Sequence, residues 1–201
     1  METWVITGGI ATGKSTVVRL LRAAIPKLVV FDADACVADL WKRPAVLSEV
    51  ESALGFSITK ASGGLDRDKM RSLLLYDKAV KKVVETVLHP LVRQECLDLQ
   101  VKSADTPAAG VPFVADIPLY FEATFPLPAE RVVVVATSRA TQLVRLQARN
   151  NFSVEISEAL LRNQLPITSK IKRADHVLWN EGPPGILQRQ LRQLLTHFNL
   201  S

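Results

Sequence analysis

A phosphate-binding motif near the start of the chain constrains the fold more than any other feature. Residues 3–21 read TWVITGGIATGKSTVVRLL and contain the pattern Gly8-x-x-x-x-Gly13-Lys14-Ser15. The residues before the motif form a short apolar, β-branched run, and those after Ser15 place apolar side chains at helical spacing. A strand, a glycine-rich loop and a helix in this order are the context in which the motif binds nucleotide phosphates.

Each part of this motif has a chemical role. Backbone N–H groups of the loop and the helix N-terminus bind phosphate oxygens. Lys14 reaches the β and γ oxygens, and the Ser15 hydroxyl ligates Mg²⁺. The predicted cradle consists of Gly8, Gly9, Ala11, Thr12, Gly13, Lys14, Ser15 and Thr16.

Five short apolar runs predict the strands of a buried sheet. They lie at residues 4–7, 28–31, 113–115, 132–136 and 176–179, and they lack the polar alternation of a half-exposed strand. Helical patterns separate them. We therefore predict one α/β domain of 201 residues, a P-loop three-layer sandwich around a five-stranded parallel sheet.

The amino-acid composition limits the classes of ligand and partner that this protein is expected to bind. The net charge of +5 favours anionic ligands, but the basic residues are dispersed, so we expect small phosphorylated molecules and no nucleic acid. No secretory signal and no apolar run of about 20 residues is visible, which predicts a protein without a membrane partner. Cys36 and Cys96 are too few for a disulfide framework, and no histidine has zinc-ligand spacing. We expect a cytoplasmic protein with no obligate protein partner.

Two intervals are too long for simple crossovers between strands. Residues 40–105 hold several helical patterns, and residues 138–173 hold two that are rich in Arg and Lys. In an open α/β sheet, ligands bind beyond the carboxyl ends of the strands. We therefore predict a core (1–39, 106–137 and 174–201), an acceptor-binding insertion (40–105) and a lid (138–173).

Three aspartates follow predicted strands. Asp32 and Asp34 come after the second strand and share one face if the chain is still extended there, whereas Asp116 ends the third. A lone aspartate after a strand is usually a helix N-cap or a turn residue. Three such residues at the edge that carries the phosphate loop favour a functional role, because phosphoryl transfer needs a carboxylate that takes the acceptor's proton.

Arginines dominate the predicted lid. Arg145 and Arg149 lie four residues apart on one helical face, and Arg162, Lys170, Lys172 and Arg173 follow. A solvated basic helix face is the usual explanation of such a run. The length of the interval favours the alternative, a lid whose guanidinium groups clamp ATP oxygens and exclude water.

The segment ETVLHPLVRQE is harder to interpret. Pro90 predicts the first turn of a new helix, with the chain bent at His89. His89 could serve as a general base, but a structural hinge is the favoured interpretation.

Taken in order, these segments resemble the dephospho-CoA kinase family, whose members have a P-loop nucleoside-monophosphate-kinase-like fold. The matching segments are TGGIATGKST, DADACVADL, LDRDKMRSLLLYD, LHPLVRQE, DIPLYFE, TQLVRLQARNNFS and RNQLPITSKIKRADHVLWNEG. The resemblance implies ATP-dependent phosphorylation of the 3′-hydroxyl of dephospho-CoA, which is the last step of coenzyme A synthesis.

The resemblance also implies residue roles. Asp34 looks like the catalytic base, assisted by Lys14 and Arg145. Arg149 and Asn180 would bind the nucleotide, the latter beside the adenine. The acceptor would contact Asp32, Arg67, His89, Pro90 and Asp116.

Two departures from the family pattern stand out. Ala11 replaces a frequent glycine of the loop, which should tolerate this small residue. Ala38 occupies a position where arginine is common, with Arg43 or Lys42 as substitutes for its charge.

Two other functions remain open: another small-acceptor kinase, acting on nucleosides, nucleotides or shikimate-like alcohols, and a P-loop regulatory protein. The Asn-Lys-x-Asp motif that a GTPase would need is absent from the sequence.

Overall fold

The computed structural model describes residues 1–104, 110–122, 127–150 and 152–200, without the side chains of residues 149 and 150. The strands are β1 (Thr3–Gly8), β2 (Val30–Asp32), β3 (Phe113–Asp116), β4 (Arg131–Ala136) and β5 (His176–Trp179). The helices are α1 (Lys14–Ala24), α2 (Ala33–Leu40), α3 (Pro44–Leu54), α4 (Arg67–Tyr76), α5 (Lys78–Ala104), α6 (Arg139–Asn150), α7 (Val154–Arg162), α8 (Ile167–Ile171) and α9 (Pro184–His197).

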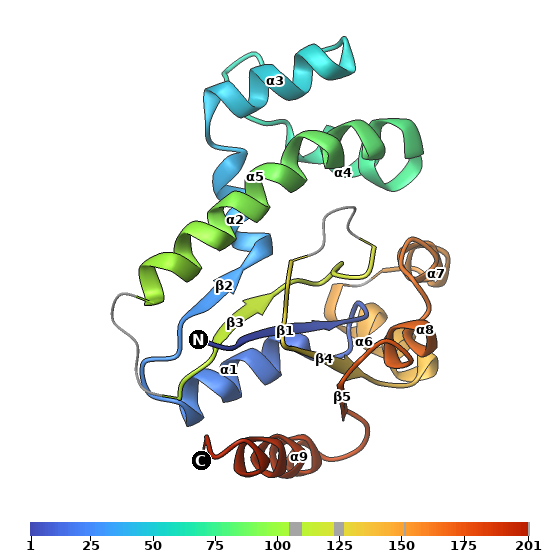
Figure 1. The fold of residues 1–201 in the computed structure, drawn as a ribbon. Helices are drawn as coiled ribbons and strands as arrows, with labels where there is room; N and C mark the ends of the chain where they lie inside the picture. The colour runs from blue at the N-terminus through green and yellow to red at the C-terminus, as the bar shows by residue number, and fades with distance from the viewer. Residues whose placement is uncertain (105–109, 123–126, 151, 201) are drawn as a thin grey trace. The chain divides into compact units, whose positions relative to one another are not determined.

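The five strands form one sheet in the order β2-β3-β1-β4-β5, with β1 at its centre (Figure 1). Strand β1 pairs in parallel with β3 and β4, and β4 pairs in parallel with β5. All five predicted strands are present, with bounds shifted by at most two residues, because parallel strands buried on both faces keep the apolar runs that the sequence shows. The register places Ile6 opposite Asp116, so the phosphate loop and this carboxylate leave the sheet at the same edge.

Helices α1 and α9 cover one face of this sheet (Figure 1). Both are amphipathic, and their apolar stripes face β1 and its neighbours. The shared core contains Trp4, Ile6, Val17, Leu21, Val114, Val133, Leu178, Leu187, Leu191 and Leu195. This packing fixes the start of α1, and hence the end of the phosphate loop, against the sheet.

The chain divides into two compact units. The first comprises residues 1–31 and 99–201, and the second comprises residues 32–98. Within the second unit, Asp66 caps α4 by accepting a hydrogen bond from the Lys69 N–H (3.1 Å), and Pro44 begins α3. Within the described ranges, no helix is long and apolar enough to cross a bilayer.

The prediction that Pro90 begins a new helix is wrong. Helix α5 runs without a break from Lys78 to Ala104, and Pro90 lies inside it. The buried residues Val84, Leu88, Val92 and Cys96 recur every four positions on both sides of the proline. Proline in a helix interior costs about 3 kcal/mol, and the continuous buried stripe offsets this cost. His89 is therefore a helical residue and not a hinge between two helices.

Candidate active site

The phosphate loop has an unusual backbone conformation at two positions. Gly13, the N-cap of α1, has φ 97°, and Ala11 has φ 59°. The left-handed conformation costs a residue with a Cβ atom about 1–2 kcal/mol, so the loop tolerates Ala11 at an energetic cost. Such strain persists only where surrounding contacts hold the backbone in place.

Side chains supply those contacts. Five consecutive carbonyl oxygens of the loop, from Gly8 to Thr12, each accept a hydrogen bond from a side-chain donor. The donors are Lys170 Nζ (2.9 Å), Thr12 Oγ1 (2.8 Å), Gln142 Nε2 (2.7 Å), Arg145 Nη1 (3.3 Å) and Asn180 Nδ2 (2.8 Å), in loop order. The carbonyls are thus turned towards the protein, the arrangement that lets N–H groups of a loop face an anion.

Two loop glycines make room for these donors. A Cβ atom on Gly13 would lie 2.1 Å from Asn180 Nδ2, and one on Gly9 would lie 2.6 Å from Gln142 Nε2. A side chain at either glycine would require the amide group of Asn180 or Gln142 to move from its position at the loop. These glycines therefore leave space for the Asn180 and Gln142 amide groups that bind the loop, in addition to their role in phosphate binding.

Lys14 and Asp116 form a largely buried ion pair. Their side chains are 14% and 7% exposed, and Lys14 Nζ donates to Asp116 Oδ1. Asp116 ends β3, as predicted, and lies beside the loop. The structure therefore brings together two predicted site residues that are far apart in the sequence.

Arg145 and Asn180 also lie at the loop. Arg145 Nη2 donates to the Asn180 carbonyl (3.0 Å), and its Nη1 faces the Ala11 and Thr12 carbonyls. The Asn180 N–H donates to the Ala136 carbonyl at the end of β4 (2.7 Å). The other predicted lid arginine, Arg149, belongs to α6, but its side chain lies outside the described residues.

A cavity of about 810 Å³ adjoins these residues. Its walls come from the loop, α1, α6 and the β5–α9 connection, and they include Ala11, Gly13, Thr16, Arg145, Asn180 and Gly182. Ligand cavities of a few hundred to about 1,000 Å³ suit a small molecule. Asn180 therefore lines the same cavity as the phosphate loop.

Glu181 is a site-supporting residue that sequence analysis missed. Its carboxylate accepts hydrogen bonds from Thr137 Oγ1 (2.6 Å), Ser138 N (2.8 Å), Ser138 Oγ (2.9 Å) and Thr141 Oγ1. The Ser138 N–H and the hydroxyl donors lower the pKa of Glu181 to about 2. Glu181 thus joins the loop before α6 to the segment that contains Asn180. Its place next to Asn180 was the only sequence signal.

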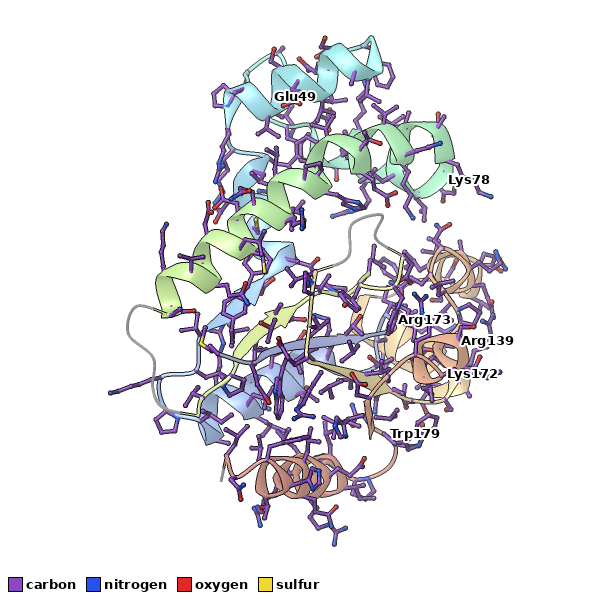
Figure 2. All side chains as sticks on the ribbon, in the orientation of Figure 1. Glu49, Lys78, Arg139, Lys172, Arg173 and Trp179 are labelled. Carbon is purple, nitrogen blue, oxygen red and sulfur yellow. The ribbon has the colours of Figure 1, made fainter. Side chains whose placement is uncertain are left out.

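Lys170 is buried, which neither explanation of the basic interval predicted. Its side chain is 0% exposed, whereas Arg162, Lys172 and Arg173 are exposed; Figure 2 labels the latter two. Lys170 Nζ pairs with Glu122 Oε1 (2.8 Å) and donates to the Gly8 carbonyl. Gln164, also unpredicted, accepts a hydrogen bond from the Ile10 N–H (2.9 Å).

In the second unit, the expected extended geometry of Asp32 and Asp34 is wrong. Asp32 ends β2 and caps α2 by accepting a hydrogen bond from the Ala35 N–H (2.9 Å), and Asp34 lies in the first turn of that helix. The cap satisfies an otherwise unpaired N–H, which starts the helix directly after the strand. Both aspartates are exposed.

The other predicted acceptor residues also lie in the second unit. Arg67 is exposed at the first position of α4. His89 and Pro90 lie on α5, where burial lowers the pKa of His89. The candidate substitutes for a charge at Ala38 have acidic neighbours: Arg43 pairs with Glu95 (2.6 Å) and Lys42 with Asp39 (2.5 Å).

The residues that the structure describes contain no cluster of three or more His, Cys, Asp or Glu side chains suited to a metal ion. Mg²⁺ at a nucleotide site needs only one or two protein oxygens, because phosphates and water complete its shell. The exposed Ser15 hydroxyl in the first turn of α1 fits that requirement.

Comparisons with known proteins decide the family. The sequence model of dephospho-CoA kinases matches residues 3–184. The chain belongs to the dephospho-CoA kinase family. A dephospho-CoA kinase from Bacillus cereus is 37% identical over 198 residues, covering 97% of this chain and 96% of the relative.

Solved structures share the fold. A protein from Thermus thermophilus has a TM-score of 0.77 and 31% identity, with 98% of this chain and 97% of that one covered. A dephospho-CoA kinase from Campylobacter jejuni, at 22% identity, shares the fold with a TM-score of 0.61 over 98% of this chain and 97% of its own. The predicted α/β P-loop kinase fold and the predicted dephospho-CoA kinase family are confirmed.

Proposed function

We infer that this chain transfers the γ-phosphoryl group of ATP to the 3′-hydroxyl of dephospho-CoA and releases coenzyme A and ADP. Membership of the dephospho-CoA kinase family supports the reaction. The observation that carries the inference at the level of chemistry is the phosphate loop, with five carbonyls turned towards protein side chains and Lys14 at its end. Phosphoryl transfer depends on such positioning and electrostatic stabilisation.

The residues around the loop would bind ATP. Lys14 would leave Asp116 for the β and γ phosphates, and Arg145 would neutralise charge on the transferred group. The cavity beside Asn180 would take the adenine. The Ser15 hydroxyl would hold Mg²⁺, which neutralises phosphate charge when bound.

Acceptor binding falls to the insertion of residues 40–105 in this proposal. Asp34 would accept the proton of the 3′-hydroxyl, and its exposure in the first turn of α2 leaves its carboxylate accessible. Arg67, His89 and Pro90 would contact the acceptor, together with Asp32 and the Asp116 carboxylate. Residues 138–173 would act as the lid that excludes water.

An acceptor panel tests the function. ADP release by the purified chain with ATP and Mg²⁺ should require dephospho-CoA, with turnover on the order of 1–100 s⁻¹. Nucleosides, nucleoside monophosphates and shikimate serve as competing acceptors. Faster turnover with one of these would assign the acceptor region to a different alcohol, while ADP release without any acceptor would indicate an ATPase.

A further inference from the structure

Two of the five side chains that donate to the loop carbonyls are charged, Lys170 and Arg145. Lys170 is the more deeply buried of the two. The carbonyls of Gly9, Ile10 and Thr12 accept hydrogen bonds from uncharged side-chain groups, either a hydroxyl or an amide. Neutral groups can therefore do this work elsewhere in the same loop. A buried ammonium at Gly8 needs a separate explanation.

Its burial is energetically expensive. Removing an ammonium and a carboxylate from water costs free energy that their attraction often fails to recover, so such a pair is weak evidence of a stabilising role. Burial lowers the pKa of Lys170, and the Glu122 carboxylate opposes this shift. Glu122 Oε1 also accepts from the Leu165 N–H (2.9 Å), but its buried Oε2 accepts no hydrogen bond from any described residue.

The Lys170 ammonium lies where it contacts the first peptide group of the phosphate loop. Gly8 ends β1, and the peptide group that follows its carbonyl carries the Gly9 N–H into the phosphate loop. The bond from Lys170 Nζ to the Gly8 carbonyl fixes the plane of that peptide. The Lys170–Glu122 pair contacts the loop through its ammonium, so its positive end faces the loop, and electrostatic interactions are less screened in a buried site.

We propose that Lys170 is a positioning residue for phosphoryl transfer, which orients the first peptide of the phosphate loop and adds positive potential behind it. Glu122 offsets the charge of the buried ammonium and so contributes to stability. The expected effect on the reaction rate rests on the proposed function. The expected effect on nucleotide binding can be measured without any acceptor.

The test separates folding from nucleotide chemistry. In Lys170→Met/Glu122→Gln both charges are removed together, so no unpaired charge is left buried, and the protein should remain folded. We expect kcat/KM for ATP to fall at least tenfold and the calorimetric Kd for ATP·Mg²⁺ to rise severalfold. The KM for dephospho-CoA should stay within about twofold. Arg192→Met, which removes an exposed positive charge on α9 outside the proposed lid, is the control and should change none of these values.

Glu122→Gln alone supplies the second measurement, which remains informative if the double variant does not fold. It retains Lys170 and the bond to Gly8, so thermal stability should fall while kcat/KM for ATP stays within about threefold of wild type. Wild-type nucleotide binding in a folded double variant would overturn the proposal. So would a tenfold loss in Glu122→Gln that matches the double variant. Failure of wild type to phosphorylate dephospho-CoA would refute the proposed function and leave the ATP·Mg²⁺ comparison intact.

Discussion

Lys14 Nζ donates to Asp116 Oδ1, and this pair links the start of α1 to the end of β3 across the edge of the sheet. Both side chains are largely buried. Lys14 therefore has a protein partner, and replacing it has a structural consequence that the motif alone does not predict. The motif suggested only a lysine that points towards phosphate.

Lys14→Ala should abolish phosphoryl transfer and also destabilise the protein. Replacing Lys14 removes the ion-pair partner of a largely buried carboxylate, at a cost on the order of 3 kcal/mol. Adding Asp116→Asn in the same chain should restore part of the stability without restoring activity. Urea denaturation and the ADP-release assay measure the two effects. Activity of Lys14→Ala within a few-fold of wild type would mean that the cradle is wrongly assigned.

Asp34→Asn should bind ATP·Mg²⁺ with near wild-type affinity and lose at least about tenfold in kcat with dephospho-CoA, because general-base removal costs about 10²–10⁴ in rate. The low end is reasonable for a loose transition state in which the proton leaves late. Weakened ATP binding with unchanged turnover would instead place Asp34 at the metal. Asp32→Ala is the structural comparison, since loss of the N-cap of α2 should cost about 1 kcal/mol of stability.

Arg145→Ala should lower kcat more than it raises the KM for dephospho-CoA, because contacts to a moving phosphoryl group strengthen in the transition state. Since Arg145 also holds the Ala11 and Asn180 carbonyls, the KM for ATP should rise as well. Arg139→Ala is the control on the same helix: Arg139 is exposed and pairs with Glu158 (Figure 2). Equal steady-state kinetics in both variants would reduce α6 to a solvated basic face.

Glu181→Gln should destabilise the protein in a pH-dependent way. The folded pKa of Glu181, about 2, lies below its ordinary value of 4.5. Its contribution is therefore fully present above about pH 4.5 and is lost as the pH falls towards 2. The difference in Tm between wild type and Glu181→Gln should be largest near pH 6 and shrink by pH 3. A difference that is independent of pH would show that the hydrogen-bond geometry matters and the charge does not.

The features of this protein that depend on neighbouring residues were predictable from the amino-acid sequence. The spacing of Gly8, Gly13, Lys14 and Ser15 encodes a strand, a loop and a helix start, and continuous apolar runs encode parallel strands buried on both faces. Even the departure at Asp32 follows a local rule, because aspartate is a preferred N-cap, and that alternative was recognised in advance. The family resemblance extended these local signals to nearly the whole chain.

The polar side chains that support the loop could be identified only from the folded chain. Lys170 and Gly8 are 162 residues apart, Gln142 and Ile10 are 132 apart, and no periodicity links them. Pro90 shows the same limit, since a long buried stripe outweighs the local tendency of proline to end a helix. Folding brings residues that are distant in the sequence into contact, in an interior where the dielectric constant is low. The same lysine can therefore be a solvated charge or a buried donor, depending on packing that its neighbours in sequence do not specify.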